Sequence, residues 1–196
     1  LIHAGAQGPL GEMFAYRVDL GRVSRTDFRG ATTERNQATA SVSFTPTRAH
    51  ALNVRISYNI DHYNTDVGIP TIEDPDNPGT WILPRGARKP ARYNTKNDFL
   101  DYQRIELGAD YRWDLSRVTF LQARANVVRD YYDYLAAEGL TYVPAQDMTP
   151  AAVEREYLHF ARAWTPIVGQ LELHSEVDTG PIRHQFVLGY ELNSFG

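Results

Sequence analysis

The sequence contains no cysteine, which excludes a disulfide-stapled scaffold and any metal site built on thiolates. No apolar run approaches the roughly 20 residues that a transmembrane helix requires, so a helical membrane protein is also excluded. Basic residues are not in excess, since the sequence has 20 Lys and Arg and 24 Asp and Glu, and both signs are mixed along the chain. Because nucleic-acid surfaces need a basic patch or stripe, we expect no DNA or RNA partner.

Catalytic and metal-binding motifs are missing as well. The 6 histidines form no His-x-x-x-His pair, and no Gly-x-Ser-x-Gly motif occurs. Asp61 and His62 are adjacent, but the alternation of the sequence around them places the two side chains on opposite faces of a strand. The sequence therefore predicts no enzyme activity, no catalytic residue, no cofactor and no metal held by protein side chains.

The first residues resemble neither a translation start nor an export signal. Leu1 to Gly5 include no initiator Met, no charged region and no apolar region of the length that a signal needs. We therefore interpret the chain as either processed or part of a longer protein.

Alternation of apolar and polar residues with a period of two is the clearest feature that is present. In residues 51–63 the apolar positions are Leu52, Val54, Ile56, Tyr58 and Ile60, and the polar ones are Asn53, Arg55, Ser57, Asn59 and Asp61. Similar runs cover residues 13–24, 34–45, 104–113, 121–127 and 182–192, and a strand stub covers residues 1–6. A less regular run spans residues 153–177, with a bend expected at Pro166. The prediction is an all-β protein of about seven or eight strands.

The connections between these runs alternate in length. Short turns are predicted at residues 8–11, 46–49, 114–117 and 178–181, and longer polar loops at residues 25–33, 64–97 and 133–152. Outer-membrane barrels have short periplasmic turns and longer extracellular loops in this order, and their strands are longer than the mean of about 5 to 6 residues in globular sheets. The pattern indicates an antiparallel up-and-down meander that forms part of a transmembrane β-barrel, with the apolar residues facing lipid and the polar ones facing the lumen.

Aromatic residues gather near the expected ends of the strands. Those close to short turns lie on apolar faces and fit a membrane-interface girdle: Phe14, Tyr16, Phe44, Tyr111 and Trp113. Those close to long loops fit either a second girdle or the lining of the entrance: Tyr63, Phe99, Tyr102, Tyr131, Tyr132, Tyr134 and Tyr157. The sequence leaves both roles open for this second group.

Three segments resemble the barrel of TonB-dependent siderophore receptors. Gly8-Pro9-Leu10 leads into Phe14-Ala15-Tyr16-Arg17, residues 58–63 are followed by Gly68-Ile69-Pro70, and Asp178-Thr179-Gly180-Pro181 leads to Val187-Leu188-Gly189-Tyr190. The resemblance spans nearly the whole chain. It implies that residues 1–196 are a partial barrel domain, roughly the first third of a wall of the 22-stranded type, from an outer-membrane receptor that imports ferric siderophores.

By the same resemblance, energy would come from the TonB complex through an N-terminal plug domain, which these residues do not include. The expected partners are thus a ferric siderophore, the TonB complex and outer-membrane lipid. Iron would be held by the siderophore. Alternatives are another outer-membrane barrel, such as a porin or a receptor for a different nutrient, or a soluble carbohydrate-binding β-sandwich whose apolar faces would pack against a second sheet.

The long loop at residues 64–97 is the best candidate for ligand contact. It combines cationic and aromatic side chains, and we single out Trp81, Arg85, Arg92 and Tyr93 as ligand-binding candidates. The alternative is a solvated loop whose basic residues meet lipopolysaccharide phosphates. Lumen-facing arginines are expected to pair with nearby acidic residues: Arg17, Arg55, Arg104, Arg112 and Arg124.

Overall fold

The computed structural model describes all 196 residues, and every regular element in it is a β-strand. The strands are β1 (Ile2–Pro9), β2 (Phe14–Thr26), β3 (Thr32–Thr47), β4 (His50–Tyr63), β5 (Ile72–Glu73), β6 (Trp81–Ile82), β7 (Phe99–Asp114), β8 (Thr119–Val143), β9 (Ala152–Trp164), β10 (Pro166–Thr179) and β11 (Ile182–Phe195). The structure contains no helix long and apolar enough to cross a membrane. The predicted all-β class is confirmed.

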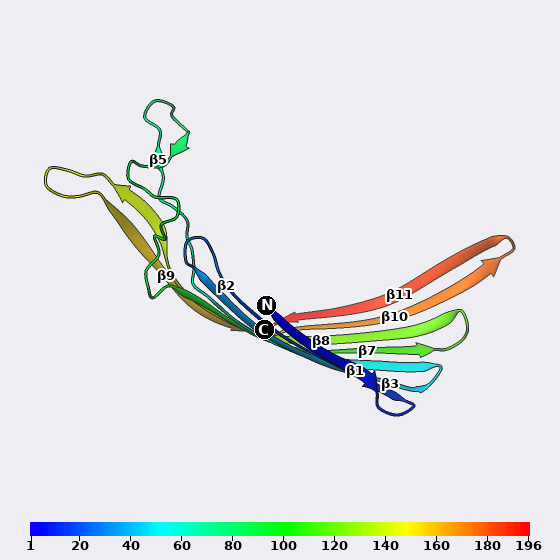
Figure 1. Cartoon of the computed structure of the whole chain (residues 1–196). Helices are drawn as coiled ribbons and strands as arrows, with labels where there is room; N and C mark the ends of the chain where they lie inside the picture. The colour runs from blue at the N-terminus through cyan, green and yellow to red at the C-terminus, as the bar shows by residue number, and fades with distance from the viewer.

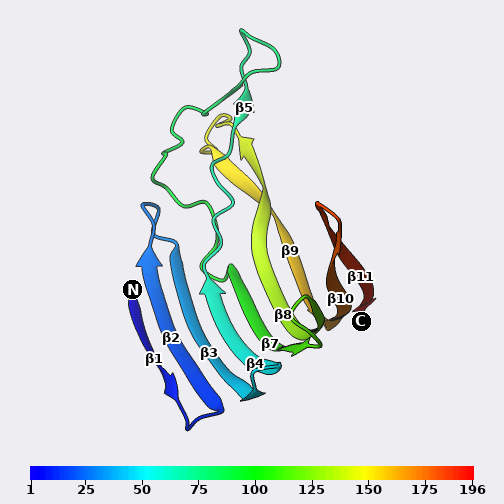
Figure 2. The same cartoon turned by 90° about the vertical axis from the view of Figure 1, so that its right-hand side faces the viewer.

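Nine of these strands form one antiparallel sheet in which strands that follow one another in the chain lie side by side, except that β9 and β10 follow each other along the same edge of β8 (Figures 1 and 2). The order is β1-β2-β3-β4-β7-β8-β10-β11, with β9 paired to the far part of β8. This arrangement is the predicted up-and-down meander. The remaining two strands, β5 and β6, make a small hairpin within the long loop.

The bend expected at Pro166 is present and divides the long run into two strands. Asp130 to Val143 of β8 pair with β9, whereas residues 119–127 of β8 pair with β10. Thr165 separates β9 from β10. Proline has no backbone N–H for the ladder, which explains why the strand is interrupted here and why the sheet has one strand more than predicted.

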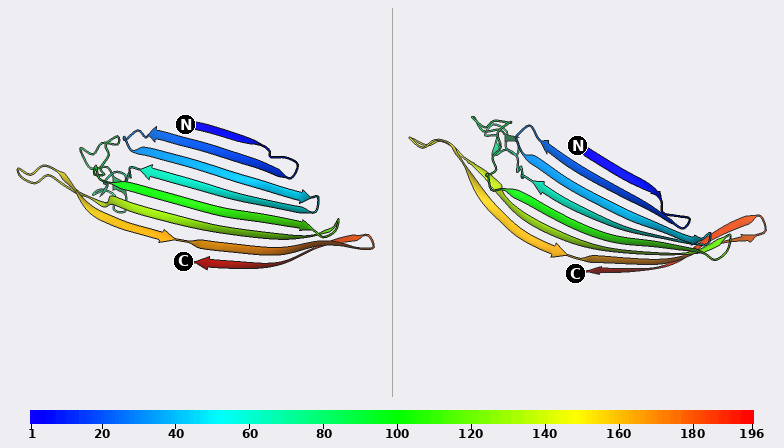
Figure 3. Two further views of the ribbon diagram at one scale, coloured as in Figure 1. Left: turned by 90° about the horizontal axis from the view of Figure 1, so that it is seen from below. Right: turned by 60° about the horizontal axis from the view of Figure 1, so that its bottom comes forward.

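The sheet is open. β1 and β11 form opposite edges, each paired on one side only (Figure 3). The free sides of both strands leave backbone donors and acceptors without strand partners. The chain by itself is therefore a curved wall and not a closed ring.

An open sheet with a bare apolar face should not stay monomeric in water. We expect the isolated chain to aggregate in detergent-free buffer, because unpaired edges and a large exposed apolar surface both promote association. Sedimentation velocity with and without a non-ionic detergent checks this. A detergent-free monomer would favour a soluble fold with a covered apolar face.

The short turns lie at one end of the sheet and the long connections at the other (Figure 1). Gly11 and Gly180, in two of the short turns, have φ values of 85° and 65°, a conformation that glycine adopts without strain. Two predicted loops were too long, because strands continue into them. β2 and β3 leave only residues 27–31 as a connection, and β8 and β9 leave only residues 144–151.

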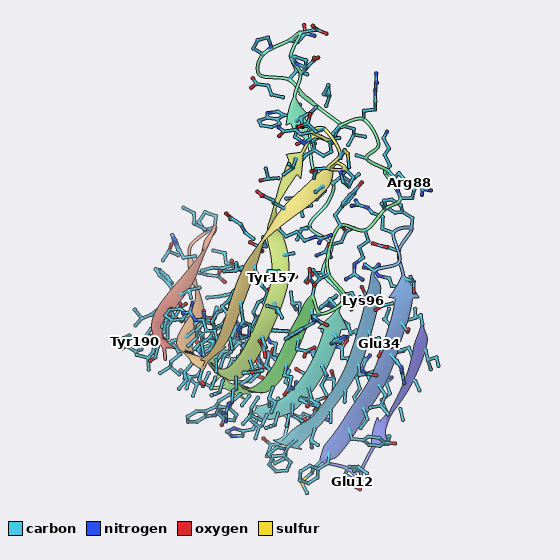
Figure 4. All side chains as sticks on the ribbon, turned by 90° about the vertical axis from the view of Figure 1, so that its left-hand side faces the viewer. Glu12, Glu34, Arg88, Lys96, Tyr157 and Tyr190 are labelled. Atoms are coloured by element: carbon cyan, nitrogen blue, oxygen red, sulfur yellow. The ribbon has the colours of Figure 1, made fainter.

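The strand register separates the side chains into an apolar face and a polar face. One row of the apolar face runs across six strands through Val18, Ala40, Ile56, Leu107, Val127 and Ile167. The adjacent row of the polar face contains Arg17, Ser41, Arg55, Gly108, Asn126 and Val168. Figure 4 shows Tyr190, an apolar-face residue of β11, projecting outward from the edge of the sheet.

The molecule has almost no hydrophobic core, since only 10 of 196 residues are buried. Ile56 and Leu107 in the middle of the apolar face are 49% and 50% exposed. The β5–β6 hairpin is the only other sheet, so the chain does not form the sandwich considered above. Backbone pairing and polar-face contacts therefore hold the sheet together.

Candidate functional site

The polar face is lined with ion pairs. Each of the five arginines predicted to face the lumen lies within 4 Å of a carboxylate on the same face. The pairs are Arg17–Asp19 at 2.6 Å, Arg55–Asp110 at 3.0 Å, Arg104–Glu106 at 3.3 Å, Arg112–Asp114 at 2.8 Å and Arg124–Asp110 at 3.7 Å. These pairs fix the side chains of neighbouring positions, as expected for a structural role.

Two polar-face carboxylates are buried and fully engaged. Asp61 is 4% exposed and accepts hydrogen bonds from Arg35 and from the hydroxyl of Tyr63 at 2.7 Å. Asp61 and His62 lie on opposite faces, as predicted, because His62 contacts Asp101 on the apolar side. Asp61 therefore has no histidine partner for catalysis.

Asp130 is the second buried carboxylate, at 6% exposure. The hydroxyl of Tyr102 donates to it at 2.7 Å and the indole Nε1 of Trp164 at 2.9 Å. These bonds tie β7, β8 and β9 together at the long-loop end of the sheet. They also fix two aromatic rings in place on the polar face.

The structure shows on which face of the sheet each aromatic residue near the long loops lies, a point that the sequence left open. Four of them lie on the polar face: Tyr63, Tyr102, Tyr132 and Tyr134. Phe99, Tyr131 and Tyr157 lie on the opposite face. On the polar side, Phe160 stacks on Tyr132 with centroids 5.3 Å apart and lies 5.2 Å from Tyr134. The rings of Tyr102, Tyr132, Tyr134 and Phe160 form what we call the aromatic wall.

The aromatics near the short turns lie on the apolar face, as the sequence predicted. Phe14 and Phe44 stack at 4.5 Å across β2 and β3. On β4 and β7, His50 stacks on Trp113 at 5.5 Å and contacts the hydroxyl of Tyr111. This belt crosses four strands at the short-turn end of the apolar face.

The long connection from β4 to β7 is attached to its neighbours at its base. Arg29, in the β2–β3 connection, pairs with Asp66 at 3.0 Å. At the other end of the loop, Asp98 is 1% exposed and accepts a hydrogen bond at 3.0 Å from the backbone N–H of Ala137 in β8. The base of the loop is thus attached to β8 by this hydrogen bond.

Asp98 also organises the last turn of the loop. It accepts hydrogen bonds from the amide of Asn94, at 2.8 Å, and from the hydroxyl of Thr95. Burial by itself raises the pKa of this carboxyl, but the hydrogen bonds from Thr95, Ala137 and Asn94 together outweigh burial and hold the pKa below its ordinary value. Asp98 is therefore an anionic anchor at neutral pH.

A pocket of about 390 Å³ opens between the long loop and the β8–β9 hairpin. Arg85 and Tyr93 line it from the loop, and Tyr142 and Arg155 line it from the hairpin. The Arg155 Nε donates to the backbone carbonyl of Tyr93 at 2.7 Å, and the Tyr142 hydroxyl donates to the carbonyl of Arg85 at 3.5 Å. The pocket therefore offers two guanidinium groups and two phenol rings at the long-loop end.

The structure brings together two of the four ligand-binding residues predicted from sequence. Arg85 and Tyr93 share the pocket. Trp81 belongs to the small β5–β6 hairpin and is 66% exposed. Arg92 donates through its Nη2 to the carbonyl of Thr65 at 3.1 Å, so it is engaged within the loop. Neither Trp81 nor Arg92 lines the pocket.

No protein-family model and no curated protein sequence matches the chain. Solved structures do. The ferric-catecholate import receptor Fiu of Escherichia coli K12, in its closed form, superposes with a TM-score of 0.82 over 96% of this chain at 23% identity. The chain has the fold of a siderophore-receptor wall. The siderophore receptor PiuA of Acinetobacter baumannii gives a TM-score of 0.77 at 18% identity, and BauA, the ferric preacinetobactin receptor of the same organism, gives 0.71 at 13%.

The chain covers 28% of the Fiu chain and 27% of the PiuA and BauA chains. All three matched proteins are receptors. The predicted resemblance is thus confirmed for the fold, which is that of part of a larger barrel.

Proposed function

We propose that the chain is part of the barrel wall of a TonB-dependent outer-membrane receptor that imports ferric siderophores. The observation that carries the proposal is the superposition of 96% of the chain on a ferric-catecholate receptor, over a sheet with one continuous apolar face. Transport would be energised by the TonB complex through a plug domain outside these residues. The long-loop end faces outward and the short turns face the periplasm.

The dimensions of the apolar face support a membrane location. Leu52 to Ile60 on β4 span about 26 Å at about 3.3 Å per residue, which corresponds to about 20 Å of membrane thickness at a tilt of about 40°. The belt containing Phe14 and Phe44 borders this band at the short-turn end. Outer-membrane barrels carry an apolar band of about 25 Å flanked by aromatic residues.

The chemistry of the long-loop end supports an anionic, aromatic ligand. Arg85 and Arg155 supply charge-assisted hydrogen bonds, while Tyr93 and the aromatic wall offer ring faces for stacking. We propose that Arg85 and Tyr93 contact the ferric siderophore directly. Trp81 would meet it first at the exposed tip of the loop, and Arg92 would hold the loop in shape through Thr65. The siderophore itself would hold the iron.

The test is ligand binding and uptake by the complete receptor carrying Arg85→Ala and Tyr93→Phe together. Loss of one guanidinium at a partly wet site should weaken binding about fivefold to tenfold, and Tyr93→Phe keeps the ring while removing the hydroxyl. Binding of a ferric catecholate is measured by intrinsic fluorescence quenching and uptake with radioactive iron, at matched surface expression.

Arg88→Ala is the matched control, since Arg88 belongs to the same loop, is exposed and does not line the pocket (Figure 4). It should bind and transport as the unmodified receptor does. Equal affinity of the pocket variant and the control would place the ligand elsewhere and leave the loop as a solvated cover.

A further inference from the structure

Arg129 is the one arginine of β8 that lies on the apolar face. It is exposed and stands opposite Ile105 of β7, and Val127 and Tyr131 are its neighbours along the strand on that face. A shallow pocket of about 280 Å³ forms around it, lined by Tyr58, Gln103, Ile105, Arg129, Tyr131 and Ala163. No acidic residue lines this pocket.

The guanidinium of Arg129 has no hydrogen-bond or salt-bridge partner within the protein. Arg124, which is on the polar face five residues earlier in β8, lies 3.7 Å from Asp110, and Arg104 of β7 lies 4.0 Å from Asp130. These polar-face arginines are neutralised by carboxylates of the chain itself. The charge of Arg129 is left for an anion from outside the chain.

Arg129 also lies at a distinct level of the apolar band. Its row across the sheet, Leu20, Ala38, Tyr58, Ile105 and Arg129, is otherwise uncharged. Two rows further toward the long loops, the same face carries Glu34, His62, Asp101 and Asp133. Arg129 therefore lies at the outer border of the band, where hydrocarbon gives way to headgroups and where tyrosines are enriched.

The break between β9 and β10 opens the sheet beside this residue. Asp130 pairs with Trp164 of β9 and Val127 pairs with Ile167 of β10, so Arg129 has no strand partner on that side. Arg129 is consequently flanked on one side by the ladder with β7 and on the other by the connection at Thr165, which belongs to no strand and whose backbone N–H donates to the carbonyl of Gly196 at 3.0 Å. This leaves room beside the guanidinium for a group larger than water.

We propose that Arg129, Tyr58 and Tyr131 bind a phosphate group of a membrane lipid whose acyl chains lie along the apolar face. A guanidinium matches the oxygen geometry of a phosphate with two parallel hydrogen bonds, and a phenol hydroxyl adds a further donor. Toward the short turns, Leu107 and Val127 continue the face with purely apolar side chains suited to acyl chains. The proposal rests on the membrane location argued above and not on siderophore transport.

The experiment uses the complete receptor in a phosphate-free, non-ionic detergent, titrated with bisphosphorylated lipid A and followed by native mass spectrometry. Lipid A from which the phosphates have been removed is the matched ligand, since its acyl chains are the same. The unmodified receptor should bind the phosphorylated lipid about tenfold more tightly, and Arg129→Gln should abolish that preference. Arg129→Lys, which keeps the charge without the fork of donors, should retain part of it.

Arg124→Gln on the same strand is the control, because Arg124 lies on the polar face beside Asp110. It should leave lipid binding unchanged. Equal retention of phosphorylated lipid by Arg129→Gln and by the unmodified receptor would overturn the proposal. So would displacement of the lipid by millimolar inorganic phosphate, since the site would then be one for a free anion. Siderophore uptake should be unaffected by Arg129→Gln, so the outcome is independent of the pocket experiment.

Discussion

Replacing Ile56 with arginine should destabilise the assembled barrel by about 2–4 kcal/mol, the cost of an arginine on the lipid face near the bilayer midplane. Ile56 lies in the middle of the apolar face of β4, between Ala40 and Leu107, and no carboxylate neighbours it on that face. A guanidinium at this position would lose its hydrating water and would have no carboxylate to pair with. The free energy of unfolding in urea, measured in lipid vesicles on the complete barrel, reports the loss.

Ser57→Arg is the matched control because it adds the same side chain one residue away. Ser57 lies on the polar face between Thr39 of β3 and Glu106 of β7, so an arginine there gains a carboxylate neighbour. Its cost should be well under that of Ile56→Arg. Equal costs at the two positions would mean that both faces see the same surroundings, and the membrane location would be wrong.

The strands could be predicted because their signal is local. In β4 a period of two persists without interruption from Leu52 to Asp61, and this alternation alone assigns every side chain to a face. The ordering of short and long connections then indicates a meander, since only hairpins can join neighbouring antiparallel strands with turns this short. The same alternation places arginines and carboxylates together on the polar face, so their ion pairs could also be predicted.

The continuation of β8 into the predicted loop at residues 133–152 could not be predicted because the alternation fails there. Beyond Val127 the positions on the apolar face are Arg129, Tyr131 and Asp133, and such a polar sequence resembles a loop. Pairing with β7, and from Asp130 onward also with β9, keeps these residues in a strand. The faces of Tyr131 and Tyr132 therefore depend on a register set by contacts between strands, and no periodicity within either segment reveals it.

Only the loop side of the pocket could be predicted, because the hairpin side belongs to segments whose alternation is irregular. Arg85 and Tyr93 carry recognisable chemistry in a long loop, but Tyr142 and Arg155 belong to residues read as a loop and a strand of uncertain register. They meet because the hairpin rises beside the loop, which depends on the anchor formed by Asp98 and Ala137. The signal that sequence did offer at Asp98 was a short Asn-Thr-x-x-Asp turn, too common to identify an anchor.

Asp98→Ala should release the long loop from β8 and cost about 2–3 kcal/mol of local stability, because buried donors of Ala137, Asn94 and Thr95 lose their acceptor. The amide of Ala137 should then exchange with solvent about 30- to 150-fold faster, as measured by hydrogen exchange on the complete barrel. Asp76→Ala, which removes an exposed carboxylate at the tip of the same loop, is the control and should leave exchange unchanged.

The same anchor should weaken in acid. The pKa of Asp98 is held below its ordinary value, so the stabilisation is complete above about pH 4, the ordinary range of an aspartate, and is lost as the pH falls through the lower folded-state value. Pepsin, which is active in this range, should cut residues 64–98 of the unmodified protein faster as the pH falls from 4 to about 2, corrected for the intrinsic pH profile of the protease. Asp98→Ala should be cut rapidly throughout and show no such transition. A transition of equal size in Asp98→Ala would show that another carboxylate holds the loop, with the paired Asp66 beside Arg29 the next to test.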